Sequence, residues 1–83
     1  MDINRVRWAS RRGMLELDLV LEPFVDKLYP TLSDAQQASF CRLLESEDQD
    51  LYRWFMRQAD PLDDNLLEIV ELVRANTGLQ PEN

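Results

Sequence analysis

The chain has 83 residues, which is enough for one small domain, and 45% of them are apolar, which is enough for one compact core. Nine basic residues stand against sixteen acidic ones, a net charge of −7, which argues against general nucleic-acid binding because phosphate contacts need clustered positive charge. Histidine is absent and Cys41 is the single cysteine, so an intramolecular disulfide and a zinc finger are excluded and an independent enzyme is disfavoured.

The first expected element is a short basic helix. Asp2 is the predicted N-cap of this helix, and the helix should end near Ser10 or Arg12. Arg11 and Arg12 would then lie in its last turn, where positive charge suits the helix dipole. Gly13 follows at the place where a left-handed C-cap residue is usual.

A second helix is expected over residues 14–29. The segment 15–21 also alternates apolar and acidic residues like a strand, but no second strand exists to pair with it, so a helix is favoured. Pro23 should kink this helix or mark its true start, and Pro30 should end it. The apolar residues at helical spacing are Leu17, Leu21, Phe24, Val25 and Leu28.

The third and fourth helices are predicted from capping signals. Ser33 has Gln36 three residues later, which is the spacing of a capping box, and Ser46 with Gln49 repeats the arrangement. The expected buried residues of these helices are Phe40, Leu43 and Leu44, followed by Leu51, Trp54 and Phe55.

A fifth helix is expected to begin at Asp60 and Pro61, an N-cap and N1 pair, and to end at Gly78. Its predicted apolar stripe is Leu62, Leu66, Ile69, Val70 and Val73. The sequence therefore predicts an all-α fold, a compact bundle of about five short helices. Residues 1–78 should form a single domain with a basic N-terminal helix, followed by a flexible tail at 79–83.

Few residues are candidates for chemistry. Cys41 lies on a predicted apolar face with no histidine to activate it, so a structural role is favoured. The acidic segment 45–50 lacks the central glycine and closing glutamate of a calcium loop, so it is interpreted as solvated acid and helix capping. No metal site is expected, because histidine is absent and the acidic segment does not fit a calcium loop. No membrane insertion is expected, since no apolar run approaches the length of a membrane span. The free cysteine favours a cytoplasmic location.

The turn from Arg12 to Glu16 is the candidate site. A structural interpretation is complete in itself, because Arg12 can close one helix and Glu16 can open the next near its positive end. A functional interpretation uses the same geometry: Gly13 at an exposed junction lets another backbone approach, with a donor and an acceptor on either side. Arg11 is added because of its charge, and Trp8 because a short basic helix has little core to offer it.

Residues 8–18, Trp-Ala-Ser-Arg-Arg-Gly-Met-Leu-Glu-Leu-Asp, resemble the signature of the SdhE family of flavin assembly factors. The family's core motif, Arg-Gly-x-x-Glu, is matched by Arg12, Gly13 and Glu16. The resemblance extends over nearly the whole chain except the C-terminal tail. Its further blocks are Pro23-Phe24, residues 40–45 (Phe-Cys-Arg-Leu-Leu-Glu) and residues 50–55 (Asp-Leu-Tyr-Arg-Trp-Phe).

The resemblance implies a small helical protein that binds the flavoprotein subunit of succinate dehydrogenase and promotes covalent attachment of FAD to a histidine of that subunit. The flavoprotein of fumarate reductase is a related client. The resemblance also implies that the client catalyses its own flavinylation, so this protein is expected to be no enzyme and to bind no cofactor tightly. By the same resemblance, Arg12, Gly13 and Glu16 should lie in the client interface near the flavin.

Two other classes stay open from the sequence. The first is an enzyme, such as a flavin transferase using acid groups, which tight FAD binding by the isolated protein would support. The second is a small acidic interaction module such as an antitoxin, because acidic helical proteins suit that role. Recovery of a flavoprotein from a lysate would favour assembly, whereas recovery of a small basic or membrane toxin would favour the antitoxin.

Overall fold

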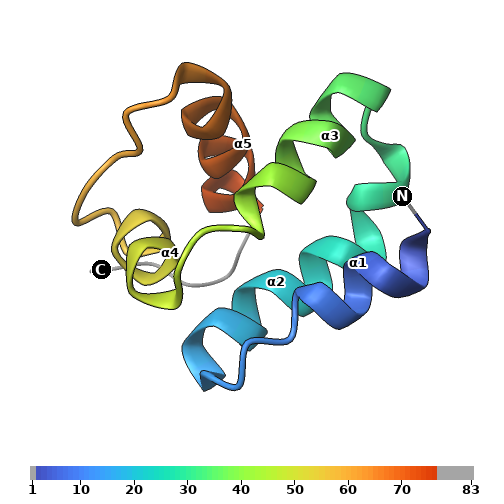
Figure 1. The fold of residues 1–83 in the computed structure, drawn as a ribbon, viewed down its shortest axis with the longest axis horizontal. Helices are drawn as coiled ribbons and strands as arrows, with labels where there is room; N and C mark the ends of the chain where they lie inside the picture. Colours follow the sequence, from blue (N-terminus) through green and yellow to red (C-terminus); the bar gives the residue numbers. More distant parts are fainter. Residues whose placement is uncertain (1, 77–83) are drawn as a thin grey trace.

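The computed structural model describes residues 2–76, which form a bundle of short helices (Figure 1). The helices are α1 (Ile3–Ala9), α2 (Leu15–Lys27), α3 (Asp34–Leu43), α4 (Asp48–Phe55) and α5 (Asp64–Ala75), with a 3-10 turn η1 at Tyr29–Thr31. This part of the chain contains no strand, so the prediction of an all-α bundle of about five helices is confirmed. None of its helices is long and apolar enough to cross a membrane. Gly78 and the predicted tail at 79–83 lie outside the described residues.

The core lies around α2, which contacts α1, α4 and α5, while α3 packs on α5. The rings of Phe24 and Phe40 stack with their centroids 5.2 Å apart and join α2 to α3. Trp54, predicted to be buried, is only half-buried. The buried apolar residues are Val6, Leu17, Val20, Leu21, Phe24, Val25, Tyr29, Phe40, Leu43, Leu44, Leu51, Phe55, Ile69, Val70 and Val73.

Helix α1 begins as predicted and ends earlier than predicted. Asp2 caps its N-terminus by accepting a backbone N–H group two residues later. The helix ends at Ala9 because Ser10 satisfies its last carbonyls, donating its hydroxyl to the carbonyl of Arg7 at 2.8 Å. Residues 11–12 therefore follow the helix, and their predicted place in its last turn is wrong.

Helix α2 runs back along α1 in the opposite direction (Figure 1). Pro23 lies inside this helix and is exposed, so it does not mark the start. The helix ends at Lys27, and Pro30 lies in η1 rather than at the helix end. Pro30 has no backbone N–H group to continue the α-helical ladder, and the chain tightens into η1, where the N–H groups of Thr31 and Leu32 donate to the carbonyls of Leu28 and Tyr29 at 2.9 and 3.1 Å.

One of the two predicted capping boxes is confirmed and the other is wrong. The Ser33 hydroxyl accepts the Gln36 backbone N–H group at 3.1 Å, and the Gln36 side chain accepts the Ser33 N–H group at 3.0 Å. Helix α4 is instead preceded by Glu47, which makes no side-chain cap. Ser46 lies in the loop before it, where the carbonyl of Ser46 accepts a hydrogen bond from Arg12 at 2.8 Å.

Helix α5 begins later than the predicted Asp60–Pro61 start. Asp63 is the N-cap, and its carboxylate accepts the backbone N–H groups of Asn65 and Leu66 at 2.8 and 3.1 Å. The bond from Leu66, followed by the side-chain bond from Arg42, lowers the pKa of Asp63. Asp63 therefore caps backbone N–H groups at the start of α5, a role that was predicted for Asp60.

Arg74 explains why Asp60 is not the cap. The Arg74 side chain is 9% exposed and donates to the carbonyls of Trp54 and Ala59 at 2.7 and 3.0 Å. It also donates to the Asp60 carboxylate at 2.9 Å, so that carboxylate is engaged with the body of α5. Leu62, predicted in the buried stripe, falls in the connecting loop and is fully exposed.

The Tyr29 hydroxyl gives the fold a pH dependence at high pH. The residue is 3% exposed, and its oxygen lies 3.7 Å from the sulfur of Cys41, which is itself half-buried. Burial, followed by the hydrogen bond with Cys41, raises the pKa of Tyr29 from 10.0 to about 12. The folded state therefore keeps a proton that the unfolded state loses, and stability present below pH 10 falls as the pH rises toward 12.

We expect the wild-type protein to lose on the order of 2 kcal/mol more than a Tyr29→Phe variant between pH 9 and pH 12. Urea unfolding followed by circular dichroism at several pH values measures this difference. Phenylalanine keeps the packing of the ring and removes the titrating group, so it isolates the tyrosine contribution. Parallel curves for the two proteins would show that Tyr29 does not cause the dependence.

Candidate functional site

Arg12, the first residue of the predicted site, is directed into the protein. Its side chain is 16% exposed and forms an ion pair with Asp48 at 2.8 Å. The same guanidinium donates to the carbonyls of Ala9, Leu44 and Ser46 at 3.1, 2.7 and 2.8 Å. The planar fork of arginine allows these four bonds at once. Arg12 thus joins the end of α1 to the loop between α3 and α4 and to the start of α4.

Gly13 forms the turn between α1 and α2. Its φ of +82° lies in the left-handed region, which glycine adopts without strain. It is not the C-cap of α1 as predicted, because that helix has already ended at Ala9. The Arg12 backbone N–H group donates to the Asp18 carboxylate at 3.0 Å and fixes the turn against the first part of α2. A Cβ atom added at Gly13 would meet nothing within 4 Å, so another molecule can approach this backbone closely.

The other predicted residues, Trp8, Arg11 and Glu16, are exposed around this turn. Trp8 is 80% exposed, which is unusual for so large an apolar side chain. Among residues 2–76, neither Arg11 nor Glu16 takes part in an ion pair. Four of the five predicted residues therefore face solvent, and Arg12 is the exception.

The structure spreads these residues over an extended surface instead of one cavity. Trp8 borders a hollow formed with Asn4 and Arg5 on α1. Arg11 lies in a small depression between α1 and α2, and Glu16 borders a third depression that reaches α4. Gly13 lies between α1 and α2 in the chain, and the turn that joins these helices is at the end of the pair nearest to α4 (Figure 1).

Three α4 residues at this surface were not among the five predicted site residues. Gln49, Tyr52 and Arg53 border the same depression as Glu16. They lie more than thirty positions away from Glu16 in the chain, and only the packing of α2 on α4 brings them there. Helical spacing on α4 could have shown that these three share a face, but it could not have shown which element that face adjoins.

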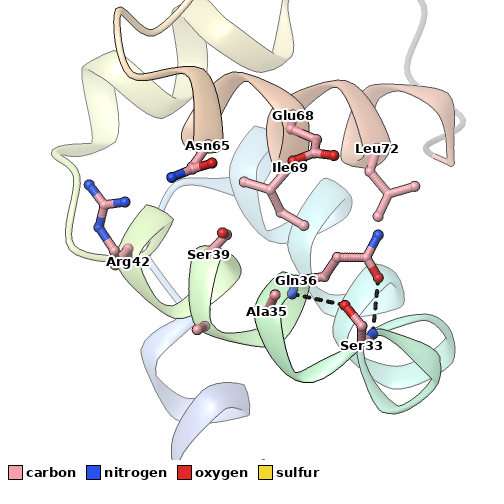
Figure 2. A pocket seen from close by; sticks show the side chains of 10 residues that line it. Ser33, Ala35, Gln36, Ser39, Arg42, Asn65, Glu68, Ile69 and Leu72 are labelled. Atoms are coloured by element: carbon pink, nitrogen blue, oxygen red, sulfur yellow. Dashed lines mark hydrogen bonds between the residues drawn. The ribbon is translucent and has the colours of Figure 1, made fainter.

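A separate groove of about 550 Å³ lies between α3 and α5 (Figure 2). Ile69 and Leu72 project into it from α5, and the Ser33–Gln36 capping box stands at one end. None of the five predicted residues lines this groove. Within residues 2–76, no three histidine, cysteine, aspartate or glutamate side chains are grouped so that they could hold a metal ion.

Known proteins resemble the chain over most of its length. The family described as "Flavinator of succinate dehydrogenase" matches residues 4–77, which include the whole turn from Arg12 to Glu16. The chain belongs to this family. A protein of Shewanella oneidensis named "FAD assembly factor SdhE" is 53% identical over 78 residues, which cover 94% of this chain and 95% of that protein. A Pseudomonas aeruginosa protein of the same name is 49% identical over 72 residues, which cover 87% and 86%.

A third relative has a lower sequence identity. The protein named "FAD assembly factor SdhE" in Pectobacterium atrosepticum is 42% identical over 71 residues, covering 86% of this chain and 81% of that protein. The resemblance first based on Arg12, Gly13 and Glu16 is therefore confirmed at the level of the family.

Proposed function

We propose that this protein binds the flavoprotein subunit of succinate dehydrogenase and promotes covalent attachment of FAD to a histidine of that subunit. The observation that carries the proposal is the family match over residues 4–77, supported by relatives that bear the name of FAD assembly factors. The client performs the bond formation itself, with FAD attached to the client and not held tightly by this protein. The flavoprotein of fumarate reductase is a second client, and the site of action is the cytoplasm.

The exposed turn suits a protein that acts by binding one conformation of its client. A ligand shifts a conformational equilibrium only by its difference in affinity for the two states, so the factor must contact the flavinylation-competent arrangement more closely. Gly13 permits such a contact at the backbone, because no side chain stands over it. Glu16 supplies an acceptor beside the turn, and Trp8 supplies a large exposed anchor.

The distribution of charge supports an oriented approach. Residues 1–12 carry four arginines against one acid, a net of +3, whereas residues 13–83 carry a net of −10. Within the described residues, Arg7 and Arg12 are paired with Asp26 and Asp48, whereas Arg5 and Arg11 are outside every ion pair. Half of the arginine charge on this side is therefore not neutralised by an ion pair. A surface whose charge changes sign at the Gly13 turn can orient an approaching client before contact.

Covalent flavin in the client tests the proposal directly. We expect the flavoprotein subunit of a strain lacking this protein to lose most of its covalent flavin fluorescence in denaturing gels, and a plasmid copy to restore it. The isolated protein should not bind FAD tightly. Unchanged fluorescence in the deletion strain would disprove the assembly role, and capture of a small basic toxin in place of a flavoprotein would support the antitoxin.

Glu16 and Glu22 make a matched pair for testing the surface. Both are exposed acids on α2, but Glu16 borders the depression that reaches α4, whereas Glu22 lies about two turns along the helix and borders the depression between α1 and α2 beside Arg11. We expect Glu16→Ala to reduce client flavinylation about tenfold, because a lost charge-assisted bond is worth about that factor, and Glu22→Ala to reduce it less. Equal effects in a flavin fluorescence assay would remove the special role of Glu16.

A further inference from the structure

A depression of about 420 Å³ connects the Gly13 turn to α4. Met14 and Glu16 border it from the start of α2, and Gln49, Tyr52 and Arg53 border it from α4. The core motif Arg-Gly-x-x-Glu includes a residue of the first of these two sides only, namely Glu16. The second side is present because α4 packs against α2.

Charge within the depression is unbalanced. The Arg53 guanidinium is paired with Asp50 on its own helix, and Arg12 occupies Asp48. Within residues 2–76, Glu16 is in no ion pair, whereas Arg53 on the opposite side of the depression is paired with Asp50, so the Glu16 carboxylate is the unpaired charge of this depression. A cation from another molecule would satisfy it with a charge-assisted hydrogen bond.

Tyr52 gives the same depression an aromatic wall. The ring is half-buried against the core, and its hydroxyl makes no hydrogen bond to any described residue. A carboxylate beside an aromatic ring and the thioether of Met14 is a combination that receives the charged head and apolar stem of a long cationic side chain. An anionic group would be repelled by Glu16.

The wall formed by α4 is held in place before any partner binds. Arg12 bonds to Ser46 and Asp48 at the start of α4, and Arg74 bonds to the carbonyl of Trp54 at its end. Two largely buried arginines thus fix the ends of this helix relative to α1 and α5. A preformed depression loses less conformational entropy on binding than a mobile one.

We propose that this depression is part of the client-binding surface and receives a positively charged side chain of the flavoprotein, with its charge at Glu16 and its stem against Tyr52. The inference rests on the proposed function, because it names a contact made with that client. It adds the exposed face of α4 to the surface around Gly13.

Charge substitutions at Gln49 provide the sharpest test, since Gln49 is uncharged, is exposed and borders the depression. We expect Gln49→Glu to tighten binding of the purified flavoprotein subunit about threefold and Gln49→Arg to weaken it about tenfold, as measured by titration calorimetry. Gln58→Glu and Gln58→Arg make the same changes in net charge at an exposed position outside the depression, and should bind like wild type.

Two further variants separate a cation from other occupants. Glu16→Gln should weaken binding about tenfold and reduce its salt dependence, because it removes the charge and keeps the shape. Tyr52→Leu should weaken binding about fivefold, with its fold checked by circular dichroism.

The outcomes distinguish this inference from the proposed function. If the wild-type protein binds the flavoprotein and neither Gln49 substitution changes the affinity, the depression is not a contact with the client, and the assembly role still stands. Weakening by Tyr52→Leu without any effect of Glu16→Gln or salt would show an apolar occupant and overturn the cationic one. Failure of the wild-type protein to bind the flavoprotein would overturn the proposed function and this inference together.

Discussion

Among single substitutions at the candidate site, Arg12→Ala should destabilise the protein most, lowering the free energy of unfolding by about 3 kcal/mol. The substitution removes one ion pair and three hydrogen bonds to backbone carbonyls from a side chain that is 16% exposed. The carbonyls of Leu44 and Ser46 lose their strongest donor, and α4 loses the anchor at its first turn. For a domain of this size such a loss is a large part of the total stability.

Urea unfolding measures this effect, with a lower midpoint and an unchanged slope expected. The melting temperature should fall by about 10 °C or more. Arg11→Ala is the matched control, because Arg11 is the adjacent arginine and is exposed, and it should change stability by less than about 0.5 kcal/mol. Arg12→Lys should recover only part of the loss, since an ammonium group cannot reproduce the planar fork.

The same experiment decides between two explanations for any loss of function at Arg12. If Arg12→Ala loses client flavinylation together with stability, the residue acts by holding α1, α3 and α4 in place. If the variant is as stable as Arg11→Ala and still fails in flavinylation, Arg12 contacts the client directly, as the sequence resemblance implies. The contacts of Arg12 in the structure favour the first explanation, because the guanidinium is already bonded four times within the protein.

Local signals in the sequence predicted much of this fold. The Asp2 cap, the Ser33 capping box and the buried stripe of α5 from Ile69 to Val73 all depend on residues within one or two turns of each other. Such interactions are fixed by the spacing of the helix itself, so the sequence displays them directly. The helical assignment of segment 15–21 was also correct, since a strand there had nothing to pair with.

The errors occur where a distant arginine determines the loop. Ser46 was expected to cap α4, but its loop is held by Arg12 from a position thirty-four residues earlier. Asp60 was expected to cap α5, but it is engaged by Arg74 from fourteen residues later. At Asp60 the tertiary bond occupies the carboxylate that would have formed the cap, whereas at Ser46 the arginine bonds to the backbone carbonyl and holds the loop itself. Sequence spacing contains no information on either long-range bond. The left-handed Arg57 after α4, with a φ of 63°, is likewise not indicated by its residue type.

The candidate site was predicted unevenly for the same reason. The exposure of Trp8 was expected because a short basic helix has little core to offer it, that of Arg11 because of its charge, and the left-handed turn follows from glycine. The inward direction of Arg12 and the presence of Tyr52 beside Glu16 depend on packing between α1, α2 and α4. A sequence motif groups residues by position in the chain, whereas the surface groups them by position in space.

Gly13→Arg should abolish client flavinylation while leaving the helices folded. The backbone at Gly13 is left-handed, so any other L-residue there is destabilised by about 1 kcal/mol. This chain already tolerates an arginine in that conformation at position 57. Because an added Cβ meets nothing within 4 Å, the new side chain would extend into solvent in the free protein and would obstruct only a docked partner.

A graded series separates backbone strain from obstruction. Gly13→Ala, Gly13→Asn and Gly13→Arg should show similar, small losses of stability by thermal unfolding, with asparagine the least affected because it tolerates the left-handed region. Client flavinylation, measured as covalent flavin fluorescence in the deletion strain, should instead fall with side-chain size, more than tenfold for arginine. Full flavinylation with Gly13→Arg would show that no partner approaches this turn closely, and the proposed contact would then have to be made through Trp8 or the face of α4 alone.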